Sequence, residues 1–250
     1  MFDISIDFQG LIKSSILAYI IGKERLGFNK KNLREPISSL FYTKTAEQFN
    51  EWNHVIKKNI NLLKSIGIKK KTISFPLVNL SQSNKLKNFL KKYGLENNSF
   101  ITLNIGAGWQ SKLLTSAQYI EIINDLKDYS KIIVLWGNRE EEIRADYIVK
   151  MTGAIKSPFL NFSDLILFIQ LSKILISSDS LPLHISDMVK TPTVGIFGPT
   201  SPERNGPLNS NTLIIHNKLK CSNCYKRYCK YKKCLENPNM EKIKEFILSI

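Results

Sequence analysis

The sequence predicts an α/β fold built on doubly wound parallel sheets. Short apolar runs typical of buried strands alternate with helical segments from residue 100 to about residue 216. Within residues 174–197 an apolar strand leads through a short helix into a second strand, which is the crossover unit of a parallel sheet. The helix of this unit follows Ser177-Ser178-Asp179-Ser180, a cluster of N-cap residue types, and Pro182 falls in its first turn.

The first 98 residues predict a strand–helix pair and two further helices. Residues 2–8 alternate weakly and predict a strand, and the apolar residues 11–21 predict a helix. Apolar spacing of i, i+3 and i+4, Trp52 included, predicts an amphipathic helix over residues 48–66. A lysine-rich helix over residues 83–93 precedes a polar break at 96–99, where we place the domain boundary.

Strands and helices then alternate. Strands are expected at 100–105 and 131–136, and a glycine-rich turn, Gly106-Ala107-Gly108, follows the first of them. Thr115 and Ser163 are the expected N-caps of two helices. The helices are expected at 115–128, 140–151, 163–172 and 240–250.

The net charge indicates which partners the chain suits, and the lengths of its apolar runs indicate its location. The chain carries 36 Lys plus Arg against 21 Asp plus Glu, a formal charge of +15, which suits nucleic acid, anionic lipid headgroups or anionic sugars. Solvated lysines without any partner explain the same balance. No apolar run reaches the roughly 18 residues of a membrane span, and no signal peptide is evident, so we expect a cytoplasmic protein with reduced thiols.

The helix that starts near Asp179 is a candidate anion site. Free N–H groups and the positive dipole end favour a phosphate there, and the start lies beyond a strand's carboxyl end, where open α/β sheets bind ligands. His184 projects from the first turn and is placed to reach the same anion. An ordinary capped helix with a surface histidine accounts for these residues equally well.

Two motifs carry a family resemblance. Asp179-Ser180-Leu181-Pro182-Leu183-His184, followed by Gly198-Pro199-Thr200, resembles glycosyltransferase family 9, the ADP-heptose:lipopolysaccharide heptosyltransferases. The resemblance implies a GT-B-type fold of two Rossmann-like domains. Residues 3–15 and 34–42 resemble an internal part of the first domain of heptosyltransferase I-like members, which implies a first domain truncated at its N-terminus. Leu181 stands where the family usually has glycine, which allows close approach of a diphosphate.

The resemblance also implies a donor site. Lys112 matches a lysine that meets the donor's diphosphate, Trp136 and Leu160 match residues beside the adenine, and Glu140 matches a residue that reaches the ribose. A surface lysine and an acidic helix start are the alternatives for Lys112 and Glu140. The implied donor-binding residues are Gly106, Ala107, Gly108, Lys112, Trp136, Glu140, Leu160, Asp179, Ser180, Leu181, Pro182 and His184.

The acceptor side has fewer matches. Arg34 corresponds to an arginine used on the anionic acceptor, with an ion pair to Glu35 as the alternative. The family's general base belongs to a Gly-Asp loop that has no counterpart in this sequence, so we nominate no catalytic residue. We therefore expect little transfer by this chain, and recovery when a segment with that loop is added. If a carboxylate here is the base after all, Asp7 and Asp179 are the candidates.

All four cysteines fall in one short basic segment. Cys221, Cys224, Cys229 and Cys234 have the spacing C-x2-C-x4-C-x4-C, which suits a structural tetrahedral zinc site, free thiols or disulfides. Seven basic residues, no acids and several tyrosines occupy residues 218–233. Such a composition also suits a knuckle that binds single-stranded nucleic acid.

Two domains, a terminal helix and one activity are therefore expected. Residues 1–98 form the rest of an acceptor domain, 99–236 a donor domain with a cysteine-rich loop at 221–234, and 237–250 a helix that packs back on the first domain. The implied reaction is inverting, metal-independent transfer of heptose from ADP-heptose to the lipopolysaccharide inner core on Kdo-lipid A, at the inner face of the cytoplasmic membrane. The alternatives are a degenerate nucleotide-sugar-binding fragment and a nucleic-acid-binding knuckle, although the resemblance implies no nucleic acid.

Overall fold

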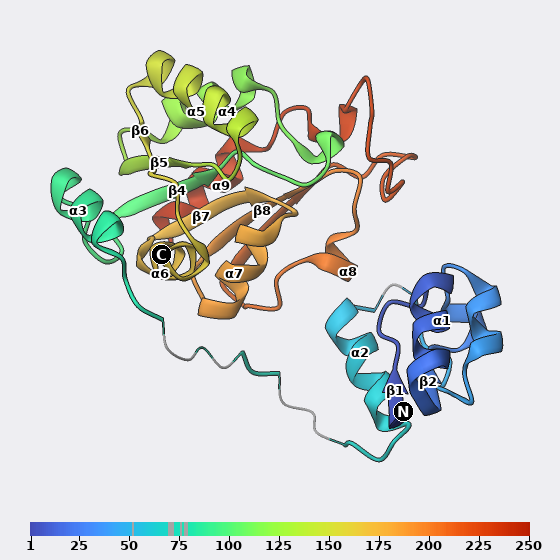
Figure 1. Cartoon of the computed structure of the whole chain (residues 1–250). Coiled ribbons are helices and arrows are strands. Elements are labelled where there is room, and N and C mark those ends of the chain that lie inside the picture. The colour runs from blue at the N-terminus through green and yellow to red at the C-terminus, as the bar shows by residue number, and fades with distance from the viewer. Residues whose placement is uncertain (52, 70–72, 76, 78–79) are drawn as a thin grey trace. The chain divides into compact units, whose positions relative to one another are not determined.

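The computed structural model describes residues 1–51, 53–69, 73–75, 77 and 80–250, so Trp52 of the expected amphipathic helix lies outside the described residues. The described residues form two compact units, Met1–Ile73 and Ser74–Ile250. Each unit has its own parallel sheet, and Figure 1 labels the elements of both. The predicted α/β class is therefore confirmed.

The first unit is a small three-stranded sheet with helices. Its strands are β1 (Phe2–Ile6), β2 (Gly22–Gly27) and β3 (Lys44–Thr45), paired in that order and all parallel. Helix α1 (Ile12–Ile21) connects β1 to β2, and the short helices η1 (Lys30–Asn32) and η2 (Pro36–Phe41) precede β3. Helix α2 (Val55–Lys64) contributes Leu62 to a core that also holds Leu26 and Phe28.

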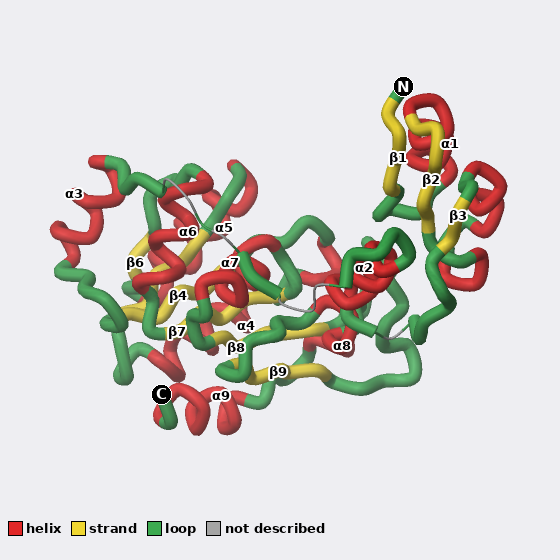
Figure 2. The backbone as a smooth tube through the Cα atoms, turned by 90° about the horizontal axis from the view of Figure 1, so that it is seen from below, coloured by secondary structure: helices red, strands yellow, loops and turns green. Residues whose placement is uncertain are grey.

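The second unit contains a six-stranded parallel sheet in the order β6-β5-β4-β7-β8-β9. This is the doubly wound order, in which the chain first builds outward from β4 in one direction and then in the other. Figure 2 shows the strands in yellow from a second direction. The strands are β4 (Phe100–Asn104), β5 (Lys131–Leu135), β6 (Ile155–Lys156), β7 (Ile174–Ser178), β8 (Thr193–Phe197) and β9 (Thr212–His216).

Helices cover both faces of this sheet (Figure 1). On one face α4 (Ser116–Leu126), α5 (Arg139–Thr152) and α9 (Met240–Leu248) bury Tyr119, Ile148 and Ile243 in a single core. On the other face lie α3 (Asn84–Tyr93), α6 (Phe162–Leu171) and α7 (Leu181–Val189). The short helices η3 (Gln110–Lys112), α8 (Pro202–Asn205) and η4 (Lys233–Leu235) lie in loops. Because both faces are covered, the central strands β4, β7 and β8 are buried along their whole length, as in other parallel sheets.

The units divide between Ile73 and Ser74, not at the boundary expected at residue 98. The reason is that α3 packs on the second unit: Leu86 is fully buried in a cluster with Phe100 and Phe168. Ser83 strengthens this contact, because its N–H and hydroxyl both donate to the carboxylate of Asp164, at 2.9 and 2.6 Å. The polar break at 96–99 is a turn within the second unit.

Two helix predictions need correction. The helix expected over residues 48–66 is shorter, since the ring of His54 accepts from the N–H of Ile56 and starts α2 at Val55. Helix α6 is capped by Asn161, whose side chain accepts from the N–H of Asp164, and not by Ser163. The apolar side of helix α9 is used within the second unit, where Ile243 and Ile247 are buried in the core.

The described part of the chain contains no helix that is both long and apolar enough to cross a bilayer.

Candidate functional site

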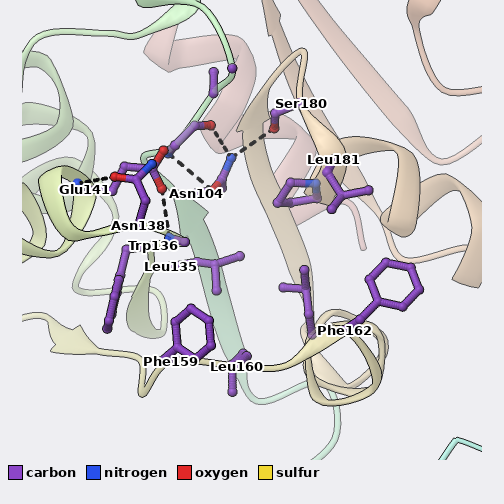
Figure 3. A pocket seen from close by; sticks show the side chains of 16 residues that line it. Asn104, Leu135, Trp136, Asn138, Glu141, Phe159, Leu160, Phe162, Ser180 and Leu181 are labelled. Atoms are coloured by element: carbon purple, nitrogen blue, oxygen red, sulfur yellow. Dashed lines mark hydrogen bonds between the residues drawn. The ribbon is translucent and has the colours of Figure 1, made fainter.

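A cavity of about 440 Å³ opens at the carboxyl ends of β4, β5 and β7 in the second unit (Figure 3). The sheet order reverses between β4 and β7, and ligands of open α/β sheets bind at this reversal. The volume is within the range of small-molecule sites. Three segments meet there: the Gly106-Ala107-Gly108 turn after β4, the end of β5 and the start of α7.

Asn104 joins two of these segments. It is the last residue of β4 and is buried, and its amide donates to the carbonyl oxygen of Gly106 at 2.8 Å. The same amide lies 2.9 Å from the hydroxyl of Ser177 and 3.1 Å from that of Ser180. The glycine-rich turn and the start of α7 are therefore fixed relative to each other before any ligand arrives.

The carboxylate of Glu141 packs against the glycine-rich turn at Gly106. Its buried carboxylate accepts from the N–H of Gly137 at 2.8 Å, and its own N–H donates to the cap residue Asn138. A Cβ added at Gly106 would lie 2.4 Å from a carboxylate oxygen of Glu141, so a side chain at position 106 would have to displace it. A residue other than glycine would therefore cost the hydrogen bond between Glu141 and Gly137.

The rest of the lining is mainly apolar. Trp136 and Phe159 stand on one side of the cavity, with ring centroids 5.8 Å apart, and Leu181 and Phe162 on the other (Figure 3). Leu160 lies between the two sides and is buried. The indole N–H of Trp136 donates to the carbonyl oxygen of Ser157 at 2.8 Å, which holds the ring in place. A planar apolar group such as a purine fits walls of this kind.

Helix α7 starts at the cavity with an uncapped end. The side chain of Ser180, the N-cap residue, does not cap the helix; its hydroxyl donates to the carbonyl oxygen of Ser178 instead. Leu181 and Pro182 form the first turn and line the cavity. A helix start of this kind attracts phosphate groups.

Beside this start, Lys112 and Asp179 form a buried ion pair. The ammonium nitrogen lies 2.8 Å from Oδ2 of Asp179, and the side chains are only 14% and 5% exposed. The ring Nε2 of His184 is 3.6 Å from Oδ1, and the amide of Asn205 is 3.4 Å from Oδ2. The pair places a cation next to the uncapped end of α7, where its charge adds to the helix dipole.

The structure brings eleven of the twelve predicted donor residues to this region. Lys112, Asp179 and His184 form the cluster next to the cavity. The other eight line the cavity itself: Gly106, Ala107, Gly108, Trp136, Leu160, Ser180, Leu181 and Pro182. Glu140 is exposed and does not line it. Glu141, the residue after Glu140 in α5, turns its carboxylate to the N–H of Gly137 and lines the cavity.

Eight lining residues were not among the predicted donor residues. They are Asn104, Leu135, Gly137, Asn138, Glu141, Phe159, Phe162 and Leu165. A polar residue at the end of an otherwise apolar strand is the signal that could have identified Asn104. The two phenylalanines are 51% and 60% exposed, and exposed aromatic side chains beside a binding loop could have been taken as a second signal.

The first unit holds Arg34 and Asp7. Arg34 is exposed, and its expected alternative partner Glu35 instead accepts from the N–H of Ile12 at 2.7 Å. Asp7 is buried and accepts from four groups: the N–H of Gln9 and Gly10 and the hydroxyls of Ser14 and Tyr42. These bonds tie the end of β1 to α1, so Asp7 is a structural residue. Burial, together with the hydrogen bond to Asp7, raises the pKa of Tyr42.

The four cysteines do not assemble a metal site. Among the described residues, no three His, Cys, Asp or Glu side chains are grouped as metal ligands, and all four thiols are free. Hydrogen bonds from the backbone of Lys232 and Tyr231 lower the pKa of Cys229, whereas burial raises the pKa of Cys234. The four cysteines are suitable zinc ligands by type, but hydrogen bonds to Ser111 and Leu113 hold the segment that carries them.

Curated relatives match nearly the whole chain. The lipooligosaccharide heptosyltransferase 2 of Campylobacter jejuni is 30% identical over 256 residues, which cover 98% of this chain and 74% of that protein. The lipopolysaccharide heptosyltransferase 1 of Campylobacter coli is 28% identical over 233 residues, 87% of this chain and 67% of that protein. The chain thus spans about two thirds to three quarters of the length of these relatives.

Solved structures share the fold. The structure titled E. coli heptosyltransferase WaaC with ADP superposes with a TM-score of 0.72 at 21% identity, over 99% of this chain and 72% of that one. A glycosyltransferase family 9 structure from Veillonella parvula gives a TM-score of 0.75 at 19% identity, over 99% and 74%. The family model described as glycosyltransferase family 9 (heptosyltransferase) matches residues 1–235. The chain therefore belongs to glycosyltransferase family 9.

Proposed function

We propose that this chain is a heptosyltransferase that uses ADP-heptose as donor and the inner core of lipopolysaccharide as acceptor. The observation that carries the proposal is the cavity at the sheet reversal, which runs from apolar walls to the uncapped start of α7, with the Lys112–Asp179 pair beside that start. Relatives named as heptosyltransferases support the reaction class, and the neighbour determined with ADP supports the nucleotide.

The apolar end suits the adenine. Trp136 and Phe159 offer aromatic faces for stacking, with Leu160 beneath. Stacking on aromatic side chains contributes about 1–3 kcal/mol per base. The backbone of Gly106, Ala107 and Gly108 is free of bulky side chains, so a ribose diphosphate can pass along it toward α7.

The cationic end suits the diphosphate. Charge develops on the ADP oxygens as the bond to the anomeric carbon breaks, and fixed positive groups lower that barrier. Lys112 and the uncapped start of α7 supply such groups without requiring a catalytic metal. Asp179 holds Lys112 at 2.8 Å, and its role in catalysis is to position the lysine and a sugar hydroxyl.

The acceptor side rests on fewer observations. An exposed guanidinium at Arg34 suits bidentate binding of a carboxylate or phosphate on an anionic inner core. We propose that transfer is inverting, that the acceptor is a Kdo-lipid A, and that the protein works in the cytoplasm against the inner face of the membrane. We assign no described residue as general base, because Asp7 and Asp179 are both held in bonded networks.

Calorimetry with ADP tests the donor site. We expect one ADP per chain and a loss of about tenfold in affinity for Trp136→Ala, since a stacking face is removed. Tyr147→Ala is the matched control, because Tyr147 is an exposed aromatic residue of the same unit that does not line the cavity. The proposal fails if the chain does not bind ADP, or if both variants weaken binding equally.

A further inference from the structure

The basic segment, residues 218–234, is built into the donor site. The backbone and hydroxyl of Ser111 donate to the carbonyl oxygens of Arg227 and Lys226, at 3.1 and 2.6 Å. The N–H of Tyr225 donates to the carbonyl oxygen of Pro199 at 2.9 Å, and the ammonium of Lys232 donates to that of Leu113 at 3.1 Å. The segment is thus attached to the loop that carries Lys112 and to the loop after β8.

Two cation–π contacts reinforce this attachment. The guanidinium of Arg204, next to the site, lies 5.5 Å from the ring centroid of Tyr225 in the segment. In the opposite sense, the guanidinium of Arg227 in the segment lies 5.7 Å from the ring of Trp109. Tyr225 has a φ of +52°, a conformation that is costly for a bulky residue and is held only by surrounding contacts. These anchors distinguish the segment from an independent knuckle.

The charge of the segment is not neutralised. Seven basic residues and no acids lie between residues 218 and 233. Within the described part of the chain, none of these seven forms an ion pair with a carboxylate. Lys112 differs, since Asp179 offsets its charge. A further cation beside Lys112 and the start of α7 would therefore strengthen the binding of a diphosphate.

Arg227 is placed to supply it. The ammonium of Lys112 lies 4.5 Å from the ring centroid of Trp109, and Arg227 lies 5.7 Å from the same centroid. The two cationic groups are consequently no more than about 10 Å apart, which is within one Debye length at moderate salt. An anion held by Lys112 is thus within the field of Arg227.

We propose that Arg227, carried by the basic segment and supported by Trp109, is a second cation on the diphosphate of the nucleotide. The proposal rests on the proposed function, because it takes the nucleoside diphosphate as the ligand of this cavity. It assigns to the cysteine-rich segment a role in donor binding that does not depend on a bound metal.

The test compares the binding of ADP and AMP in two variants, one at an arginine and one at a lysine of the basic segment. Dissociation constants for both nucleotides are measured by calorimetry for the unmodified chain, Arg227→Ala and Lys230→Ala. Lys230 is the matched control, because its ammonium lies over Tyr231 and not over Trp109. We expect Arg227→Ala to weaken ADP about tenfold, as loss of a charge-assisted hydrogen bond does, while AMP changes less than twofold and Lys230→Ala changes neither. Arg227→Lys should retain part of the ADP affinity.

The outcomes separate this proposal from the function it rests on. If the unmodified chain prefers ADP over AMP and Arg227→Ala leaves that preference intact, only the role of Arg227 is overturned. Equal losses in Arg227→Ala and Lys230→Ala would mean that the segment acts as a diffuse field without a specific contact. Failure of the unmodified chain to bind ADP would overturn both proposals.

Discussion

Lys112 illustrates how one residue can serve both stability and binding. Its ion pair with Asp179 is nearly inaccessible to solvent, so each charge depends on the other. Removing one partner of such a pair leaves an unpaired buried charge, whereas removing both is far less costly.

We predict that Lys112→Met lowers the free energy of unfolding by about 3 kcal/mol and that Lys112→Met with Asp179→Asn recovers most of the loss. Chemical unfolding in a Trp52→Phe background isolates the second unit, because the remaining tryptophans, Trp109 and Trp136, belong to it. Equal stability of the single and double variants would show that the pair is not energetically coupled.

The cysteines differ from one another in reactivity. Backbone hydrogen bonds lower the pKa of Cys229, so more of it is thiolate near neutral pH, and the raised pKa of the partly buried Cys234 keeps that thiol protonated. We predict that iodoacetamide modifies Cys229 well before Cys234 at pH 7, and that the difference narrows as pH rises above both pKa values. Mass spectrometry of digested protein gives the order. Faster labelling of Cys234, or protection of all four by a co-purified metal, would contradict this assignment.

At the scale of elements, the start of α7 is the proposed diphosphate site. Leu181 occupies the first helical position, is 54% exposed and lines the cavity where the family pattern has glycine. Its φ is not positive, so leucine fits without strain, and its cost is steric obstruction of the ligand.

We predict that Leu181→Gly raises ADP affinity several-fold, with Leu181→Ala intermediate, because the diphosphate can approach the helix backbone more closely. The expected loss of stability is below about 1 kcal/mol, since the helix start tolerates glycine better than the interior does. Calorimetry with the three proteins tests the order. A fall in affinity on shortening the side chain would mean that Leu181 instead covers the bound nucleotide.

Much of the second unit was predictable from helix caps and apolar runs. Ser83 and Thr115 start α3 and α4 as their sequence positions indicate, and the glycine-rich turn follows β4 as expected. The choice between Glu140 and Glu141 was not predictable, because three consecutive glutamates fit the same pattern and the cap at Asn138 decides the register. The cysteine spacing likewise indicates possible metal ligands, but it does not reveal the hydrogen bonds that attach the segment to neighbouring loops.

At the scale of the molecule, the boundary between the two units depends on the packing of α3, which no local sequence pattern predicts. Helix α3 is lysine-rich, yet its apolar side packs in the core of the second unit. The exposed Arg34 belongs to the other unit, so acceptor and donor functions are expected to divide between the two units.

We predict that this chain transfers heptose to a Kdo-lipid A acceptor at least 100-fold more slowly than the Campylobacter jejuni relative at equal concentration. The reason is that Asp7 and Asp179, the two candidate bases, are both held in hydrogen-bonded networks. A positioned group that accepts the proton contributes about 10²–10⁴-fold to such a rate. Product mass and ADP release give the rates. If the two rates are similar, loss of activity in Asp7→Asn or Asp179→Asn would identify the base, and our assignment of both residues as structural would be wrong.

The central claim, that the cavity at the sheet reversal is the donor site, is tested most directly by a crystal structure of this chain with ADP. We predict adenine between Trp136 and Leu160, and a diphosphate at the start of α7 within hydrogen-bond distance of Lys112. The second unit also contains a polar cavity beside Lys173 and Lys190, at the opposite ends of the strands. ADP bound there, with the predicted cavity empty, would contradict the account.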